Sequence, residues 1–407
     1  MAFALYSIYV LSGFANDWAL HLFGVKAYLS TITLFLLPLL WLFSGQAWRG
    51  LRSSAGLCWA GFLLWMLIAT PFSVWQGGSA AMLANYVPRA YCEFFYTASF
   101  VTSLRQCRRW MYLQIASGAA LLVDCWALGT ATNARFRVPG SLFYGNSNDL
   151  ALALLLAITS FLFLLQSRSK VARFGGVLGI FCAVFYAFRT GSRGGVISGC
   201  ALLLFLVCFS RAKWKFAVFG AATLGIAFAS GTSSALHRLS QEDDSSVASQ
   251  EQRRALLATS LRYTFEHPLF GVGPDQFAAA VSRDDPSKPW LGTHNTYTQI
   301  SSECGIPALI FYVGAIVICL RSNLQLYRRT RDPHIAAVSQ CLLAGTLVFA
   351  VSAFFFHMAY SAYLPELAGF SVSLRLLRGN EQPARELGEI HQALYPRQQL
   401  AHGAPVQ

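Results

Sequence analysis

The sequence predicts an all-α polytopic membrane protein with about 12 transmembrane helices. Of its 407 residues, 55% are hydrophobic and only 12% are charged, and the mean hydropathy is +0.47. Apolar runs recur along almost the whole chain, and a helix of about 20 apolar residues crosses the hydrocarbon core of a bilayer. The composition therefore favours a bundle of membrane-spanning helices over a large soluble core.

Twelve apolar segments are the candidate spans. They cover residues 3–20, 26–44, 54–76, 83–103, 111–129, 147–166, 174–190, 194–210, 216–231, 303–320, 336–356 and 362–377. Asp17 interrupts the first of them and Glu366 the last. The first segment has no basic start and leads directly into further spans, so we expect no cleavable signal peptide.

The basic residues predict the orientation of these spans. Alternate connections, together with the C-terminal end, hold 19 of the 31 lysines and arginines. The positive-inside rule makes that side cytoplasmic, with both termini inside. Topology thus explains most of the net charge of +13, and we expect no nucleic-acid partner. Residues 1–378 form one transmembrane domain and residues 379–407 a polar cytoplasmic tail.

One long extracytoplasmic segment, residues 232–293, separates the ninth and tenth spans. Its second half has the pattern of an amphipathic helix, because Leu257, Leu261 and Phe265 recur every four residues and share one face. Pro268 and the glycine that follows at position 271 are expected to end the helix. We expect this helix to lie on the membrane or to cap the bundle.

Twelve basic residues lie on or near the outer face, against the topological bias. Two of them, Arg189 and Arg193, are one helical turn apart in the stretch "FRTGSRGG", between two apolar runs. An arginine at mid-membrane costs about 2.5 to 3.5 kcal/mol on insertion scales, so such residues are functional candidates. The glycines of this stretch favour an anion site, because they let backbone N–H groups approach a ligand closely. Snorkelling into lipid headgroups is the alternative.

Two further pairs of arginines belong to the same outer face. Arg135 and Arg137 lie in "NARFRVPGSLFYGNSND", residues 133–149, where Asn148 is the expected N-cap of the next helix. Arg253 and Arg254 lie on the amphipathic helix. Arginine suits bidentate contacts to phosphate, so a lipid-borne phosphate or diphosphate that enters from the bilayer is the expected ligand. Membrane lipids are therefore among the expected partners.

His294 stands before the tenth span in "GTHNTYTQISSECGIPALIFY", nine residues ahead of Glu303. It is either a structural histidine or a base that acts at neutral pH. No metal is expected, because the sequence has no HExxH motif and its ten cysteines lie in or beside apolar runs. The acidic clusters at 242–244 and 283–285 are interpreted as solvated charge. No nucleotide fingerprint is present, so no cofactor is expected.

Three motifs together resemble the O-antigen ligase and polymerase superfamily of bacterial inner membranes. They are "RTGSRGG" after an apolar run, an arginine followed after fourteen residues by "PLFGVGPDQF", and "HNTYTQISSECGIPALIFY". The resemblance depends on the order of the three motifs and on the distances between them in the sequence. It covers about residues 133–320. The first hundred residues match only in being hydrophobic.

The resemblance implies a GT-C-like, metal-independent, inverting glycosyltransferase with one long periplasmic helical loop and an active site that faces the periplasm. The donor it implies is a glycan linked to undecaprenyl diphosphate. By this resemblance the catalytic residues are His294, Arg193 and a loop arginine, either Arg253 or Arg254. The family often has Trp four residues after that arginine, where this chain has a leucine at position 257, so the register stays open. Arg189, Arg135 and Arg137 are expected to bind the diphosphate.

Several functions are compatible with that resemblance. A ligase moves a polysaccharide onto the lipid A core oligosaccharide, a polymerase extends the lipid-linked chain, and a protein O-glycosyltransferase modifies serine. The protein-modifying class usually carries an extra soluble domain, and the single dominant outer loop favours the ligase. A transporter of lipid-linked glycan is the alternative from a different class, and it would need the arginines but not His294.

Overall fold

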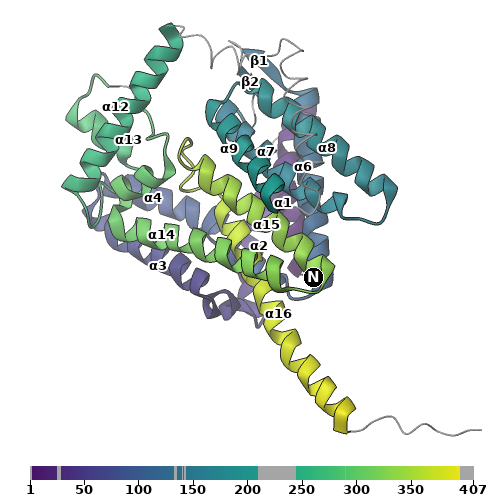
Figure 1. The fold of residues 1–407 in the computed structure, drawn as a ribbon. Coiled ribbons are helices and arrows are strands. Elements are labelled where there is room, and N and C mark those ends of the chain that lie inside the picture. Colours follow the sequence, from purple (N-terminus) through teal and green to yellow (C-terminus); the bar gives the residue numbers. More distant parts are fainter. Residues whose placement is uncertain are drawn as a thin grey trace, which may run out of the picture.

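The computed structural model is a bundle of helices in which segments far apart in the sequence lie side by side, such as α3 along α14 (Figure 1). It describes residues 2–24, 29–132, 135–139, 141, 144–209, 244–288 and 290–394. The predicted span 216–231 lies outside these residues, as do parts of the outer segment and of the C-terminal tail. The mostly helical class is confirmed for the described part of the chain.

The elements up to residue 209 are α1 (Ala2–Phe23), α2 (Leu29–Phe43), η1 (Ala47–Arg52), α3 (Ser54–Ala69), η2 (Thr70–Phe72), α4 (Gln76–Tyr86), η3 (Val87–Tyr91), α5 (Glu93–Phe100), α6 (Leu104–Ala127), β1 (Thr130–Thr132), β2 (Arg135–Arg137), α7 (Ser147–Leu165), α8 (Lys170–Arg189) and α9 (Arg193–Phe209). Those that follow are α12 (Asp244–Glu266), α13 (Phe277–Asp284), α14 (Thr296–Arg329), α15 (Pro333–Ser352) and α16 (Tyr363–Leu394). The antiparallel pair β1 and β2 is an addition to the all-α prediction.

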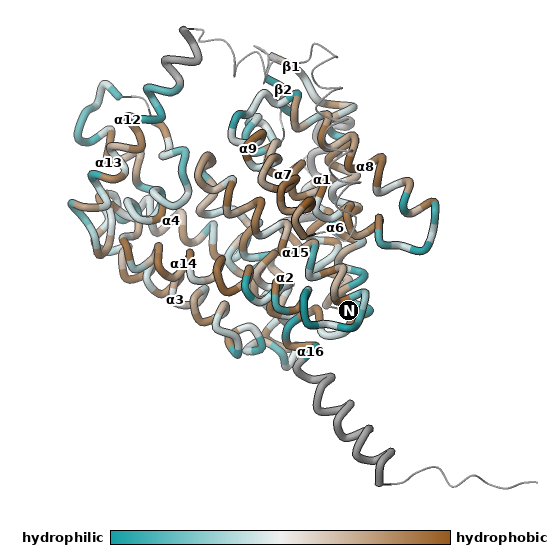
Figure 2. Tube along the Cα trace, viewed as in Figure 1, coloured by the Kyte–Doolittle hydropathy of each residue, from teal (hydrophilic) through white to brown (hydrophobic). Residues whose placement is uncertain are grey.

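Five of the described helical segments are long and apolar enough to cross a membrane. They are Ser54–Phe72, Ser147–Leu165, Lys170–Arg189, Thr296–Arg329 and Pro333–Ser352. Shorter apolar helices cover Ala2–Phe14, Ile32–Phe43 and Arg193–Phe209. Hydrophobic residues dominate most of these helices, whereas the connections carry the hydrophilic ones (Figure 2). The chain is therefore a membrane protein, and the number of about twelve spans stays a prediction.

The predicted span 83–103 is not one regular α-helix. α4 ends at Tyr86, the chain widens into the π-helical turn η3, and α5 begins at Glu93. The physical reason is Pro88 within that turn, since proline lacks an N–H and its ring clashes with the preceding helical turn.

The carboxyl group that interrupts the last predicted span is accommodated by hydrogen bonds. α16 runs through Glu366 without a break, and the side-chain amide of Gln114 donates to its Oε1 at 2.6 Å. Nearby, the hydroxyl of Tyr6 donates to Oε2 of the buried Glu93 at 2.9 Å. Polar groups inside a helix bundle persist where neighbouring helices supply such partners.

The amphipathic helix predicted in the outer segment is present as α12, but its predicted apolar face is not the buried one. Leu257, Leu261 and Phe265, the outer stripe of this helix, are 38%, 40% and 75% exposed. The buried positions are Leu256, Ser260, Tyr263 and Thr264. They are three or four residues apart and so form one face, which packs towards α13 and α14. Within the described part of the chain, the outer stripe is thereby free of protein contacts that would bury it, and we predict that it contacts the membrane.

These two faces lead to a matched stability prediction. Leu256→Ala is expected to lower the free energy of unfolding by about 2 kcal/mol, because it empties a place in the cluster with Tyr263, Val272 and Phe277. Leu261→Ala, on the outer stripe, is expected to change it by less than about 0.5 kcal/mol. Thermal unfolding of the purified protein in detergent measures both. Equal losses for the two variants would contradict the assignment of faces.

Candidate functional site

The connection between α8 and α9 is a turn of three residues. Arg189 is the last residue of α8 and Arg193 the first residue of α9. Within the turn, Gly191 has φ of +61°, a left-handed conformation that glycine adopts without a steric penalty. The tight connection predicted between these two arginines is therefore confirmed.

Gly195, one of the glycines expected to favour an anion site, uses its N–H within the protein. Its N–H donates to the hydroxyl of Ser192 at 3.1 Å. A Cβ on Gly195 would lie 2.9 Å from Cβ of Ala151 in α7, and one on Gly194 would lie 2.6 Å from Cβ of Phe355. The physical role of these glycines is thus close packing, which small residues allow between helices.

The N-cap of α7 is Asn146 and not Asn148 as predicted. Oδ1 of Asn146 accepts the N–H of Asn148 at 3.0 Å. Asn148 is buried, and its own Oδ1 accepts a hydrogen bond from the hydroxyl of Ser192 at 2.8 Å. This bond joins the start of α7 to the start of α9, and so it helps to fix the position of Arg193, the first residue of α9.

Arg189 anchors the β-hairpin. Its guanidinium carbon lies 4.9 Å from the ring centroid of Phe136 and 5.8 Å from that of Phe185, which are cation–π contacts. Phe136 is buried between Arg135 and Arg137 in β2, and alternation along a strand turns both arginines to the other face. The role of Arg189 in binding the diphosphate remains a prediction.

His294 is held from both sides by its neighbours. It has φ of +53°, which is uncommon for a residue other than glycine. Asn295 is the N-cap of α14, and its Oδ1 accepts the N–H groups of Tyr297 at 2.9 Å and Thr298 at 3.1 Å. On the other side, the hydroxyl of Thr293 donates to the carbonyl of Asn295 at 2.9 Å. The imidazole is therefore attached to a well-fixed piece of backbone.

The start of α14 is also bound to the connection between α15 and α16. The N–H of Thr296 donates to the carbonyl of Ala353 at 2.7 Å, and its hydroxyl donates to the carbonyl of Phe356 at 2.8 Å. The same hydroxyl accepts the N–H of Met358 at 3.0 Å. Residues of that connection are thus packed beside His294.

The motif "PLFGVGPDQF" packs against α14 where that helix is interrupted. Gly305 has φ of +85°, so the helical hydrogen bonds are interrupted there. The motif supplies replacements: the N–H of Ile306 donates to the carbonyl of Pro268, and the N–H of Val272 donates to the carbonyl of Ser302, both at 2.8 Å. Because the motif follows α12 directly, the break fixes α12 against α14.

Arg253 on α12 is half-buried close to Arg193. Burial first, and then the charge of Arg193, lowers the pKa of the Arg253 guanidinium below its ordinary value. Arginine nevertheless stays protonated in proteins. Within the described part of the chain Arg253 makes no ion pair. Two neighbouring positive charges create a potential that attracts an anion.

The same positive charges act on His294. Burial lowers the pKa of its imidazole below 6.5, and the charges of Arg253 and Arg135 lower it further. The imidazole is therefore neutral at pH 7 and can accept a proton. The structure brings together four of the predicted site residues, namely Arg135, Arg193, Arg253 and His294.

Arg254 and Arg137 are placed differently. Both side chains are exposed, whereas Arg253 and Arg135 are half-buried. Their predicted roles remain predictions. Of the two loop arginines, Arg253 is the one whose surroundings suit a site beside Arg193 and His294.

Sequence reasoning missed His357, in the connection between α15 and α16. Its Nε2 lies 3.1 Å from the side-chain amide nitrogen of Gln299 in α14. The pKa of His357 is lowered to about 4, first by the protein that encloses the ring and then by the nearby His294. The available signal was an ionisable residue in a short connection between two predicted spans.

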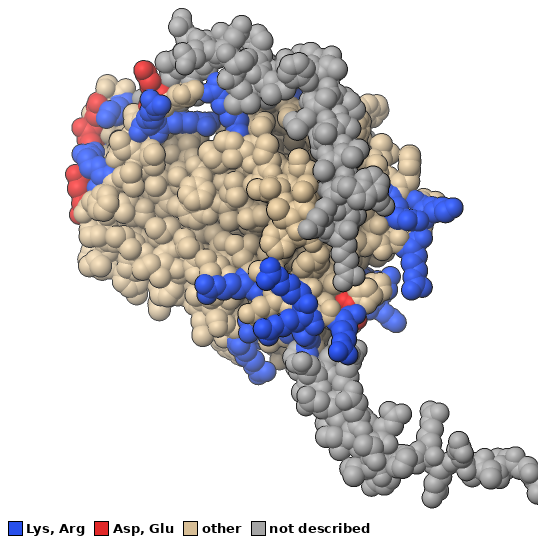
Figure 3. Space-filling view, in the orientation of Figure 1, with Lys and Arg blue, Asp and Glu red and all other residues tan. Residues whose placement is uncertain are grey.

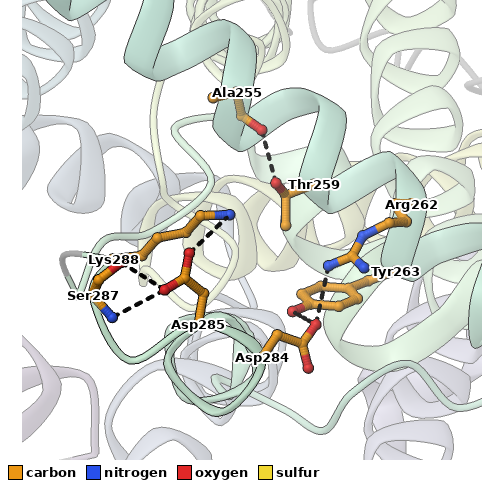
Figure 4. A network of polar contacts seen from close by, with 8 residues as sticks. All are labelled: Ala255, Thr259, Arg262, Tyr263, Asp284, Asp285, Ser287 and Lys288. Carbon is orange, nitrogen blue, oxygen red and sulfur yellow. Dashed lines mark hydrogen bonds and ion pairs between the residues drawn. The ribbon is translucent and has the colours of Figure 1, made fainter.

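Charged side chains from the C-terminal half of α12, from α13 and from the residues after α13 form an exposed network (Figure 4). Asp284 accepts hydrogen bonds from the hydroxyl of Tyr263 at 2.7 Å and from Arg262 at 3.0 Å, and Lys288 lies 3.9 Å from Asp285. Such exposed pairs contribute about 0 to 1 kcal/mol each. The prediction that the acidic cluster before Pro286 is solvated charge is confirmed.

Charge is distributed unevenly over the molecule. In Figure 3 the visible acidic side chains gather mainly around α12 and α13, whereas Lys and Arg dominate the end where α16 leaves the bundle. At that end Arg378 donates to the carbonyl of Arg329, the last residue of α14. His294 precedes the first residue of the same helix, so the candidate site and this basic end lie at opposite ends of α14. The orientation in the membrane stays a prediction.

Residues 178–313 match the family model described as O-antigen ligase. Over these residues the chain is similar to the O-antigen ligase family, which supports the O-antigen ligase and polymerase superfamily. This confirms the resemblance, and the superfamily supports a membrane enzyme of the glycosyltransferase kind. The matched segment contains Arg193, Arg253 and His294, whereas Arg135 and His357 lie outside it.

No curated protein matches this chain significantly. Among solved structures, a chain of a peptidoglycan synthase complex is similar over 78% of this chain and 96% of that one, at 15% identity and a TM-score of 0.44.

Proposed function

We propose that this protein is an O-antigen ligase, which transfers a polysaccharide from undecaprenyl diphosphate to a sugar hydroxyl of the lipid A core oligosaccharide. The observation that carries the proposal is the positive charge of Arg253 and Arg135 close to His294, with Arg193 close to Arg253. The matched family supports glycosyl transfer of this kind, and the single long outer segment favours a ligase over a polymerase. The enzyme works in the bacterial inner membrane, with its site facing the periplasm.

In this proposal the arginines hold the donor diphosphate. Guanidinium groups form charge-assisted hydrogen bonds to phosphate oxygens, each worth about 1.5 to 3 kcal/mol. The negative charge on the diphosphate increases as the glycosyl bond breaks, so contacts from Arg193 and Arg253 strengthen in the transition state. These contacts supply the charge that a divalent cation would otherwise provide, and the proposal needs no metal.

His294 acts as the general base. The acceptor hydroxyl oxygen attacks the anomeric carbon of the donor, and the bond between that carbon and the diphosphate oxygen breaks with its electron pair going to the diphosphate. The proton of the hydroxyl passes to the imidazole of His294. Attack from the face opposite the diphosphate inverts the configuration of the sugar. Burial and the nearby arginines keep His294 unprotonated and ready for this step.

A strain without this protein tests the proposed function. We expect its lipopolysaccharide to lack polymer and its lipid-linked polymer to accumulate, with both defects reversed by the wild-type chain. The measurement is gel separation of lipopolysaccharide together with analysis of extracted lipid-linked glycans. Accumulation of single repeat units would instead indicate a polymerase. Unchanged lipopolysaccharide and unchanged lipid-linked glycan would exclude both functions.

A further inference from the structure

His357 has a defined tautomer, because Gln299 is itself fixed. The N–H of Ala359 donates to Oε1 of Gln299 at 3.2 Å, which identifies the oxygen end of that side chain. The other end, Nε2, has only hydrogens to offer, and it lies 3.1 Å from Nε2 of His357. Nε2 of His357 must therefore accept this hydrogen bond. In the neutral imidazole the proton is then on Nδ1.

The Nδ1–H of His357 is available to a ligand. Nδ1 makes no hydrogen bond within the described part of the chain, and solvent reaches the His357 side chain. The ring also depends on the absence of a side chain at Gly292, where a Cβ would lie 2.6 Å from Nδ1. Gly292 is two residues before His294, so His357 belongs to the same site.

Charges distinguish the two histidines. The charges of Arg253 and Arg135 both lower the pKa of His294, whereas among the described residues only the charge of His294 lowers that of His357. No carboxylate of the described residues acts on His357, and α14 presents the neutral Gln299 to it. Among the described residues, His357 is thus influenced by His294 and not by an arginine. A neutral hydrogen-bond donor there suits a neutral ligand better than a diphosphate.

We propose that His357 binds the acceptor saccharide by donating Nδ1–H to a sugar oxygen beside the hydroxyl that His294 deprotonates. This inference rests on the proposed glycosyl transfer. With Nε2 engaged by Gln299 and Nδ1 already protonated, His357 does not serve as a second base. It positions the acceptor, and the arginines position the donor.

Two substitutions of nearly equal size separate this role from a structural one. His357→Asn keeps an N–H donor near the position of Nδ1, whereas His357→Gln keeps only a group near Nε2. With purified full-length protein, lipid-linked polymer and lipid A core, we expect His357→Gln to raise the KM for the acceptor by about 5-fold to 10-fold, the loss of one neutral hydrogen bond. The Asn variant is expected to stay within about 3-fold of the wild type, and both keep the KM for the donor.

The variant Gln299→Glu adds a readout that a structural role would not move. A carboxylate beside Nε2 requires a proton on that nitrogen. At low pH the imidazolium still donates from Nδ1, but at higher pH the remaining proton stays on Nε2 and the Nδ1 donor is lost. We therefore expect the KM for the acceptor to rise with pH in this variant and not in the wild type.

The outcomes separate the two proposals. If the wild type does not transfer polymer to the core, the proposed function fails. If it does, and His357→Gln keeps the wild-type KM for the acceptor, only the role of His357 is overturned. A rise in the KM for the donor, or equal losses in the Asn and Gln variants with unchanged thermal unfolding, also overturns it.

Discussion

Replacing His294 by alanine is expected to lower the rate of glycan transfer by about 10²-fold to 10⁴-fold, the usual contribution of a general base. The backbone around residue 294 is fixed by Asn295 and Thr293, so the truncation should remove the base and leave the fold intact. The measurement is the transfer of lipid-linked polymer to lipid A core by purified protein. Adding EDTA to every reaction tests the proposed independence from metal at the same time.

The pH dependence of the wild type gives an independent check on His294. Its pKa lies below 6.5 because burial and two arginines disfavour the protonated form. The active, neutral form thus predominates at pH 7 and above. The rate should fall only as the pH drops through the lowered pKa. An acid limb that persists unchanged in His294→Ala, or a rate in that variant close to wild type, would remove His294 from the mechanism.

The helical class was predictable because, in a chain of this composition, apolar runs of about 20 residues are typical of membrane-spanning helices. The faces of the helices were less predictable. In α12 the apolar residues Leu257, Leu261 and Phe265 are exposed, whereas Ser260 and Thr264 are buried. Lipid is as apolar as a helix interface, so hydrophobicity alone does not distinguish the side that faces lipid from the side that faces protein. A hydrogen bond such as that between Thr264 and Ser301 makes the polar side the packed one.

Breaks in helices were equally hidden from the sequence. The pattern around Gly305 is that of one continuous apolar span, and only the motif that follows α12 explains the interruption. A Cβ at Gly305 would lie 2.0 Å from the carbonyl oxygen of Leu269, so the two segments meet backbone to backbone. Such a contact joins residues more than thirty positions apart, and it produces no periodic pattern of residue types in either segment that could predict it.

The candidate site was predictable to the extent that its residues violate the charge bias of a membrane protein. Arg193, Arg253 and His294 stood out because each is an ionisable residue on the predicted outer face, and each belongs to one of the three motifs that carry the family resemblance. His357 did not stand out, because its neighbours in the sequence are apolar and its partner Gln299 comes from another helix. What makes a histidine functional here is a fixed tautomer and a position beside His294, and both arise only on folding.

The two adjacent loop arginines give the second large prediction. Arg253→Ala is expected to reduce transfer by about 10²-fold to 10³-fold, as the loss of a preorganised donor to a developing negative charge does. Arg254→Ala is expected to stay within about 3-fold of wild type. The reason is position, since Arg253 is half-buried beside Arg193 and close enough to act on His294, whereas Arg254 is exposed.

The neighbour serves as the control, because both variants remove one positive charge from the same turn of α12. Long-range attraction of the anionic donor should therefore weaken equally in the two, and raising the salt concentration should reduce that shared part. Only the Arg253 variant should lose rate at saturating donor, because only its contact strengthens in the transition state. Similar losses in both variants that disappear at high salt would reduce Arg253 to a contribution to surface charge and would leave Arg193 as the principal diphosphate-binding arginine.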